Sequence, residues 1–281
     1  MKKIVFAYMA AAAIMFAAIA YAEETEETVS LFDQKWAVSA SSNNNMGIFS
    51  QYTDLYISNR PWEIGLGLRY KKLSAQLAMP IASKKFSVDF AFNFYFEKTF
   101  YEAYFKYYDD LYVMNSDKNS GLDILSSGMM ATYVFNYENH SLSSVINLDK
   151  KQSESSGSML YGFGVFYTSI HSTTETMNHY TERQRLLYTG PSIGYSYIWV
   201  FENGLFLNVS FLFLSNFGLN ITMNEWLTIP QIEPRVVFGN HKKRWSFNIK
   251  LMNNSAIIVW DDKDYDMLTL LTFSTMFSVR F

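Results

Sequence analysis

Apolar and polar residues alternate at every second position through much of the chain. From 86 to 96 each even-numbered residue is apolar, and polar residues such as Asp89 stand between them. The same alternation runs through 205–213 and 245–251. Successive side chains of a strand point to opposite faces, so this pattern predicts strands with one apolar face. Similar patterns predict further strands at 62–70, 73–80, 99–108, 129–137, 141–148, 159–170, 187–200, 231–239 and 271–281.

Many antiparallel strands fit either a soluble sandwich or barrel or a membrane barrel. Strands of about ten residues with aromatic residues at their ends are typical of outer-membrane barrels. We therefore predict an all-β fold, an antiparallel transmembrane β-barrel of about 12 strands in a range of roughly 10–14. Tight turns at 201–204 and 239–243 alternate with predicted long polar loops at 109–126, 171–185 and 253–266, while 149–158 fits either end.

The N-terminus predicts export. Lys2 and Lys3 precede an apolar run that ends in Ala20-Tyr21-Ala22, which is the pattern of a secretory signal peptide cleaved after Ala22. The alternative is an uncleaved anchor, because the run is nearly long enough to span a bilayer. The acidic stretch that follows favours cleavage. The predicted organisation is a signal peptide (1–22), an acidic N-terminal segment (23–34) and the barrel (35–281).

The last strand places Phe273, Phe277, Val279 and the terminal Phe281 on one apolar face. This ending resembles the C-terminal signal by which Gram-negative outer-membrane proteins are passed to the barrel assembly machinery. The last strand must also pair with the first, because an open edge is not tolerated in lipid. The resemblance implies a location in the cell outer membrane. It implies outer-membrane lipids, the assembly machinery and periplasmic chaperones in transit as partners.

Composition excludes several classes of protein. The chain has no cysteine, which excludes a thioether-linked lipoprotein anchor, a cysteine nucleophile and a thiolate metal site. Its formal net charge of −3 gives no indication of nucleic-acid binding, which requires a basic surface.

Charged residues within the predicted strands lie on the face opposite the phenylalanines, so we expect them to face the lumen. An unpaired charge in a dry lumen is costly, and the mixture of signs favours pairing. About twelve strands lie between the filled eight-stranded barrel and the water-filled porin, so a salt-bridged interior and a narrow polar pore both remain open. The predicted lumen-facing charges are Arg69, Asp89, Glu102, Lys106, Glu233, Arg235 and Lys250, with Glu63 on the same face.

Three blocks of the chain stand out: GLGLRYKKLSAQLA (65–78), QSESSGSMLYG (152–162) and YTGPSIGYSYIWVFENGLFLNVS (188–210). They resemble a family of bacterial outer-membrane barrels, the domain of unknown function 4421. The resemblance implies the barrel fold and the outer-membrane location, and it supplies no catalytic residue.

Two clusters invite a chemical interpretation. His171, Glu175 and His179 stand four apart, as zinc ligands on one side of a helical turn would, but they lie in a threonine-rich loop with no further ligand pair. His140 next to Ser141 suggests a hydrolase, but neighbouring residues of a strand point apart and NYENHS favours a hairpin turn. We therefore predict no catalytic residue, no metal ligand and no cofactor.

The sequence thus predicts a non-enzymatic outer-membrane protein. A small-solute channel and a structural surface protein are the two leading hypotheses, and an outer-membrane lipid-modifying hydrolase is the alternative.

Overall fold

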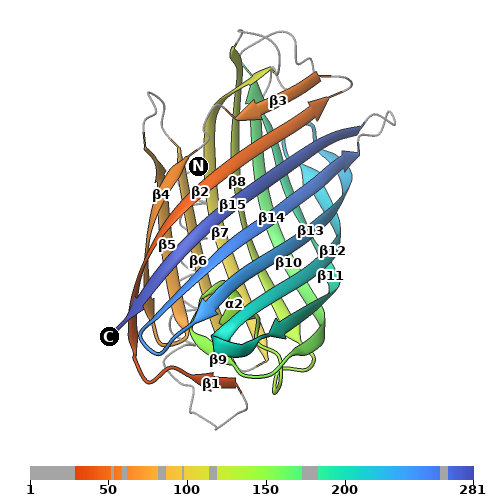
Figure 1. The fold of residues 1–281 in the computed structure, drawn as a ribbon. Coiled ribbons are helices and arrows are strands. Elements are labelled where there is room, and N and C mark those ends of the chain that lie inside the picture. Colours follow the sequence, from red (N-terminus) through yellow and green to blue (C-terminus); the bar gives the residue numbers. More distant parts are fainter. Residues whose placement is uncertain are drawn as a thin grey trace.

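The predicted all-β barrel is confirmed. The computed structural model describes residues 29–51, 54–58, 62–81, 87–96, 98–113, 119–172, 183–259 and 265–281. Twelve antiparallel strands form a closed ring (Figure 1). They are β2 (Trp36–Gln51), β4 (Glu63–Tyr70), β5 (Leu73–Pro80), β6 (Val88–Phe96), β7 (Thr99–Val113), β8 (Asn119–Val134), β10 (Ser156–Ser172), β11 (Gln184–Val200), β12 (Leu205–Asn220), β13 (Glu225–His241), β14 (Trp245–Val259) and β15 (Tyr265–Arg280).

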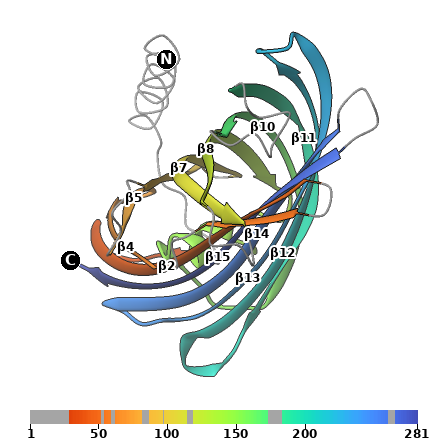
Figure 2. The ribbon, with the colours of Figure 1, turned by 90° about the horizontal axis from the view of Figure 1, so that it is seen from above.

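The ring closes where the last strand meets the first. β15 pairs with β2 from Arg280 opposite Ala37 to Asp266 opposite Gln51. The backbone N–H of Phe281 extends this seam by donating to the carbonyl oxygen of Trp36 at 2.9 Å. Every barrel strand is therefore paired on both sides, as a lipid environment requires, and the ring surrounds a lumen (Figure 2).

The two ends of the barrel differ. At the upper end in Figure 1, the short strand β3 (Asp54–Ser58) pairs with both β2 and β7. It bypasses β4, β5 and β6, which have only 8, 8 and 9 residues against 15–17 in the other nine barrel strands. The wall formed by β4, β5 and β6 is thus lower than the rest of the ring.

The lower end holds the C-terminus and an internal segment between β8 and β10 that folds into the barrel (Figure 1). We call residues 135–155 the plug. It contains a short helix, α2 (Leu142–Ile146), and β9 (Lys150–Gln152), which pairs with β1 (Val29–Leu31). The 3₁₀ turn η1 (Glu202–Gly204) joins β11 to β12 at this end. The segment 149–158, which fitted either end by sequence, therefore lies at the lower end.

Several predicted elements need correction. The strand predicted at 141–148 is wrong, because Leu142–Ile146 is the helix α2. The strand β2 was not predicted, so the count of twelve agrees only because one false strand replaced one missed strand. The long loops predicted at 109–126, 171–185 and 253–266 are wrong in extent, since β7, β8, β10, β11, β14 and β15 all run into them.

The predicted N-terminal regions are only partly described. The signal peptide with Ala20 and Ala22 lies outside the described residues. Within the acidic segment, Val29–Leu31 forms the short strand β1.

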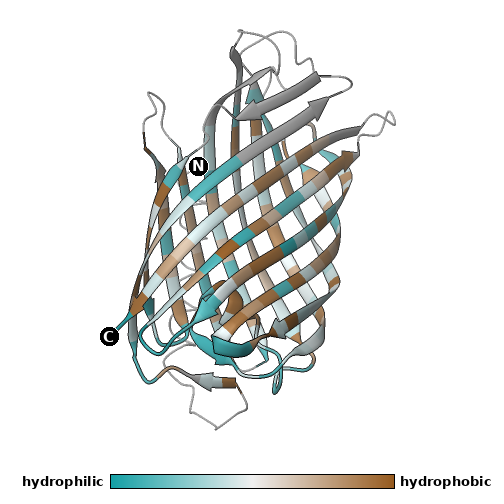
Figure 3. Ribbon diagram, viewed as in Figure 1, coloured by the Kyte–Doolittle hydropathy of each residue, from teal (hydrophilic) through white to brown (hydrophobic). Residues whose placement is uncertain are grey.

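The outer surface of the barrel is apolar. Phe273 and Phe277 of β15 are 40% and 49% exposed, and the outward residues of β12 and β14 are equally apolar. Polar and apolar residues alternate along the strands facing the viewer in Figure 3, with hydrophilic residues gathered at the lower turns. Such a surface is the inverse of that of a water-soluble protein and matches a hydrocarbon environment. In the described part of the chain, no helix is long and apolar enough to cross a membrane.

Candidate functional site

The lumen is built in layers, and β13 shows their order most clearly. From top to bottom its buried inward residues are Leu227 and Ile229, then Gln231, Glu233 and Arg235, then Val237. A polar layer thus lies between two apolar layers. We call this layer the polar belt; around the ring it comprises Glu63, Asp89, Glu102, Lys106, Gln231, Glu233, Arg235, Lys250 and Asn254.

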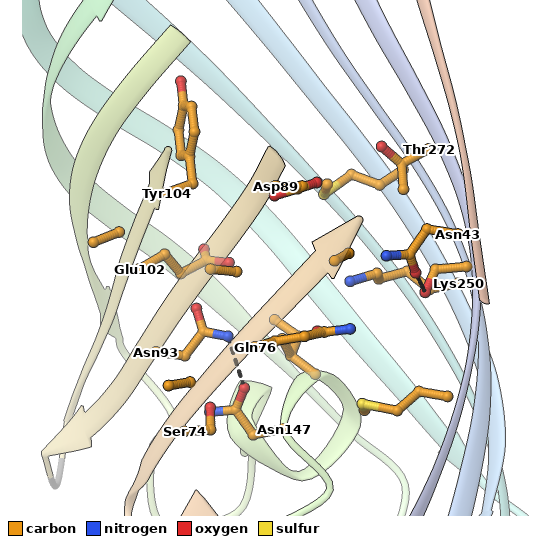
Figure 4. Close-up of a pocket in the computed structure, with 18 of the residues that line it drawn as sticks. Asn43, Ser74, Gln76, Asp89, Asn93, Glu102, Tyr104, Asn147, Lys250 and Thr272 are labelled. Carbon is orange, nitrogen blue, oxygen red and sulfur yellow. Dashed lines mark hydrogen bonds between the residues drawn. The ribbon is translucent and has the colours of Figure 1, made fainter. Parts of the chain in front are cut away.

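Within the polar belt lies a cavity of about 160 Å³ (Figure 4). Its walls carry amides, hydroxyls and charges together with small or flexible apolar residues such as Ala78, Met252 and Met276. Its floor includes Ile146 and Asn147, which belong to the plug rather than to any strand. By the measure of about 10–15 Å³ for one water, the cavity has room for about ten waters or for a small organic solute.

Among the described residues, two ion pairs lie in the polar belt. Lys106 Nζ lies 3.1 Å from Asp89 Oδ2, and these residues are direct partners on β7 and β6. Arg235 Nη2 of β13 donates to Glu102 Oε1 of β7 at 3.2 Å, which joins distant strands across the lumen. Both pairs are mostly buried, so removing one partner would leave an uncompensated charge.

The remaining carboxylates are held by amides. Glu233 Oε1 accepts hydrogen bonds from Gln231 Nε2 and Asn254 Nδ2, both at 2.8 Å. Glu63 Oε2 accepts from Asn45 Nδ2 at 2.6 Å. The belt therefore combines charge pairing with hydrogen bonding, which is what a buried polar layer requires.

The structure brings the predicted lumen charges together. Arg69, Asp89, Glu102, Lys106, Glu233, Arg235 and Lys250 all line the same cavity. Glu63 is buried beside them and acts electrostatically on Lys106. Two of the seven differ from the rest: Lys250 forms no ion pair within the described residues, and Arg69 Nε and Nη2 have no hydrogen-bond partner there.

Below the cavity the plug fills the lumen with apolar side chains. Leu142, Val145, Ile146 and Leu148 are buried, and they belong to one hydrophobic cluster with inward residues of the wall. The wall residues at this level include Tyr95, Phe100, Val134, Leu160, Ile198, Phe206 and Val237. The helix forms here because Ser141 caps it, its hydroxyl accepting from the N–H of Ser144 at 3.3 Å.

Hydrogen bonds fix the plug to the surrounding strands. Asn248 Nδ2 of β14 donates to the carbonyl oxygen of Val145 at 2.9 Å. Asn93 Nδ2 of β6 donates to Asn147 Oδ1 at 3.0 Å (Figure 4). From β15, Arg280 Nη2 donates to the carbonyl oxygen of Leu148 at 2.9 Å. Strands β14, β6 and β15 therefore hold residues 145–148, at the C-terminal end of α2 and directly after it.

One buried carboxyl belongs to the same region. Asp149 is 1% exposed, and burial raises the pKa of its carboxyl, while the nearby charges of Arg69 and Lys150 oppose that shift. Arg69 and Asp149 thus act on each other electrostatically, one from the wall and the other from the plug.

His140 does not meet the serine that the sequence placed next to it. Its Nδ1 lies 3.2 Å from both the carbonyl oxygen and the hydroxyl of Ser156, whereas Ser141 is used as the helix cap. His140 Nε2 is buried and has no partner in the described residues. Burial lowers the pKa of His140 to about 4, and the bond to Ser156 opposes this only in part. A His–Ser pair therefore exists, but no acid orients it there.

The second cluster is mostly outside the described residues. His171 lies at the upper end of β10, opposite Asp123 of β8, whereas Glu175 and His179 are not described. Among the described residues, no group of three or more histidine, aspartate or glutamate side chains is close enough together to hold a metal ion.

Sequence reasoning missed the plug and the amides around the cavity. Leu142, Val145 and Ile146 stand at the i, i+3, i+4 spacing of a helix, and Ser141 precedes them as a cap. That spacing was sufficient to predict α2. The amides Asn43, Gln76 and Asn93 carry no comparable pattern, because a polar inward residue looks alike whether it faces water or a partner.

The comparison with solved structures gives weak superpositions at low sequence identity. Similar solved structures include Neisserial surface protein A (9% identity, TM-score 0.29, 88% of this chain and 97% of that one). A second is the toluene transporter TodX of Pseudomonas putida (6% identity, TM-score 0.30, 93% of this chain and 99% of that one). A third is the outer membrane protein OmpT of Vibrio cholerae (6% identity, TM-score 0.28, 88% of this chain and 99% of that one). Superpositions this weak do not bear on function.

The comparison with curated proteins found no match. A family, however, is shown: the sequence model of the domain of unknown function DUF4421 matches residues 24–279, nearly the whole chain. The chain therefore belongs to the DUF4421 family.

Proposed function

We propose that the protein is a non-enzymatic outer-membrane barrel that acts as a small-solute channel, closed at its lower end by the plug. One observation carries this proposal: the floor of the cavity is formed by Ile146 and Asn147 of the plug, not by the strands. The obstruction and the cavity are therefore in direct contact. Displacing the plug would extend the cavity through the lower end of the barrel.

Bilayer recordings test the channel. The ends of the plug lie next to each other, since the N–H of Phe135 donates to the carbonyl oxygen of Met159 at 3.1 Å. Residues 138–156 can thus be replaced by Asn-Gly, a sequence suited to a tight hairpin, without changing the register between β8 and β10. We expect the full chain to conduct rarely and the shortened chain to show frequent stepwise openings. Arg235→Glu in the shortened chain should change its ion selectivity.

The second candidate is a structural surface protein whose lumen stays closed. The ion pair Arg235–Glu102 favours it because paired charges on β13 and β7 hold distant parts of the wall together. The same recordings separate the candidates: a shortened chain that forms a stable barrel but remains silent would support the structural role and reject the channel.

A lipid-modifying hydrolase has the weakest support. His140 is buried in the plug, Ser156 is half-buried at the start of β10, and the pair lacks an orienting acid among the described residues. Lipid turnover in detergent that disappears in His140→Ala, with the barrel still folded, would establish an enzyme against our proposal.

We infer an outer-membrane location from the apolar outer surface, with outer-membrane lipids, the assembly machinery and transit chaperones as partners. Fractionation with heat-dependent gel mobility checks this, and recovery as a soluble protein would contradict it.

The assembly signal is proposed to be Phe273, Phe277, Val279 and Phe281. Of these, Phe273, Phe277 and Phe281 point outward on the described surface. Deleting Phe281 should lower the amount of assembled barrel, and normal assembly would reject the signal.

A further inference from the structure

Among the charged residues that line the cavity, Lys250 has no carboxylate partner within the described residues. Lys106 pairs with Asp89 and Arg235 with Glu102. Glu233 is held by two amides, and Asp149 lies near Arg69. No carboxylate of the described residues lies within ion-pair distance of Lys250, although its side chain lines the cavity. Lys250 therefore lines the cavity without a carboxylate partner among the described residues.

A second donor lies on the same wall. Lys250 stands opposite Ser274 in the ladder between β14 and β15, and Ser274 stands opposite Asn43 in the ladder between β15 and β2. The Ser274 hydroxyl donates to Asn43 Oδ1 at 2.7 Å, which occupies the carbonyl end of that amide. The amide nitrogen of Asn43 is left on the cavity side, and Lys250 lines the same wall two strands away (Figure 4). The ammonium of Lys250 and the amide N–H₂ of Asn43 both offer only hydrogen-bond donors.

Part of the cavity lining near these donors is apolar. Met252 is the next inward residue on β14, and Met276, Ala78 and Ala91 also line the cavity. A free inorganic anion would leave these side chains without contacts. A carboxylate on a short hydrocarbon chain would satisfy both the donors and the apolar lining, and the cavity of about 160 Å³ has room for it.

We propose that the cavity binds a small monocarboxylate. Its carboxylate accepts hydrogen bonds from Lys250 Nζ and Asn43 Nδ2, and its hydrocarbon part lies against Met252 and Met276. The charge-assisted bond from Lys250 is the stronger of the two. As the class of solute for a channel, this assignment rests on the proposed function, but the site itself does not require that solutes pass through.

Calorimetric titration of the refolded full chain in detergent tests the site, with butyrate as the probe and butylamine and chloride for comparison. We expect butyrate to bind, butylamine not to bind, and Lys250→Met to weaken butyrate binding at least tenfold. Lys243→Met removes an exposed lysine from the turn between β13 and β14 and should leave binding unchanged. Equal butyrate binding by Lys250→Met, or no binding by the wild type, would overturn the site. Chloride binding as tight as butyrate would overturn the ligand class.

Heat-dependent gel mobility checks that Lys250→Met is folded. If it is not, Asn43→Ala removes the second donor, and we expect a loss of several-fold in affinity; an unchanged affinity would count against the site. Failure of this proposal is distinguishable from failure of the channel. Butyrate binding with silent bilayers would keep the site and reject the channel, whereas openings without butyrate binding would do the reverse.

Discussion

The plug and the polar belt fill the same lumen by opposite means. The plug packs Leu142, Val145, Ile146 and Leu148 against apolar wall residues, so its stability comes from burial of surface. The polar belt balances charges such as Lys106 and Asp89 against each other, and its stability depends on every group keeping its partner. The plug should therefore tolerate a smaller apolar residue but no charge. The belt should tolerate a matched exchange of partners but no single loss.

The largest effect is expected from a charge in the plug. Val145 is 1% exposed, so Val145→Asp would bury a carboxylate without a partner, at a cost of several kcal/mol. We expect the plug to leave the lumen and bilayer openings to become frequent. Asn139→Asp places the same carboxylate at an exposed site of the plug and should change neither. Equal behaviour of the two variants would mean that apolar packing does not hold the plug.

A smaller loss is expected when one charge of the belt loses its partner. Asp89→Asn leaves Lys106 buried without its carboxylate, which should cost about 3–5 kcal/mol and lower the midpoint of heat-dependent mobility. The double variant Asp89→Asn, Lys106→Met should recover most of that loss. Additive destabilisation in the double variant would show that the pair is not coupled.

Acidification should weaken the plug through His140. Its pKa is lowered to about 4 in the folded protein and is near 6.5 when unfolded, so the folded state binds fewer protons. This contribution to stability is complete above about pH 6.5 and is lost as pH falls towards 4, by roughly 3 kcal/mol in total.

Asp149 acts in the opposite direction, because its pKa is raised and its protonated form is favoured in the folded protein. The relevant measurement is thus the difference between wild type and His140→Asn in bilayer openings from pH 7 to pH 4. If both respond equally to acid, His140 does not control the plug.

The smallest effect concerns the hydrogen bond between Asn248 of the barrel wall and Val145 of the plug. Asn248→Ala removes the hydrogen bond to the carbonyl oxygen of Val145 and should cost about 1 kcal/mol of plug stability. We expect slightly more frequent openings and an unchanged melting midpoint of the barrel. A large fall in that midpoint would mean that the plug and the wall unfold as one unit.

The sequence predicts the barrel best where lipid dictates the residues. In β12 the outward positions Val209, Phe211 and Phe213 are all apolar, and the period of two is unmistakable. In β2 only Trp36, Val38 and Ala40 continue such a face before serine and asparagine follow on both faces. That run resembles a loop, so the strand was missed although it forms half of the closing seam.

For the interior of the barrel, the sequence predicts which residues are polar and point inward, but not which of them pair. Alternation placed the seven charges inside, but it does not give the partners. Asp89 and Lys106 are neighbours in a ladder, so a correct register would suggest that pair. Glu102 and Arg235 are 133 residues apart on strands that do not pair, and only the closed geometry brings them together.

The low wall formed by β4, β5 and β6 has a consequence for the surrounding bilayer. Eight residues extend about 26 Å, and at the usual tilt of about 40° they cover roughly 20 Å along the membrane normal. The apolar band of an outer-membrane barrel is about 25 Å tall, whereas the neighbouring long strands exceed it. The bilayer beside β4, β5 and β6 should therefore be several Å thinner than elsewhere around the barrel. This hydrophobic mismatch would make that side of the barrel the preferred one for short-chain lipids or for a neighbouring protein.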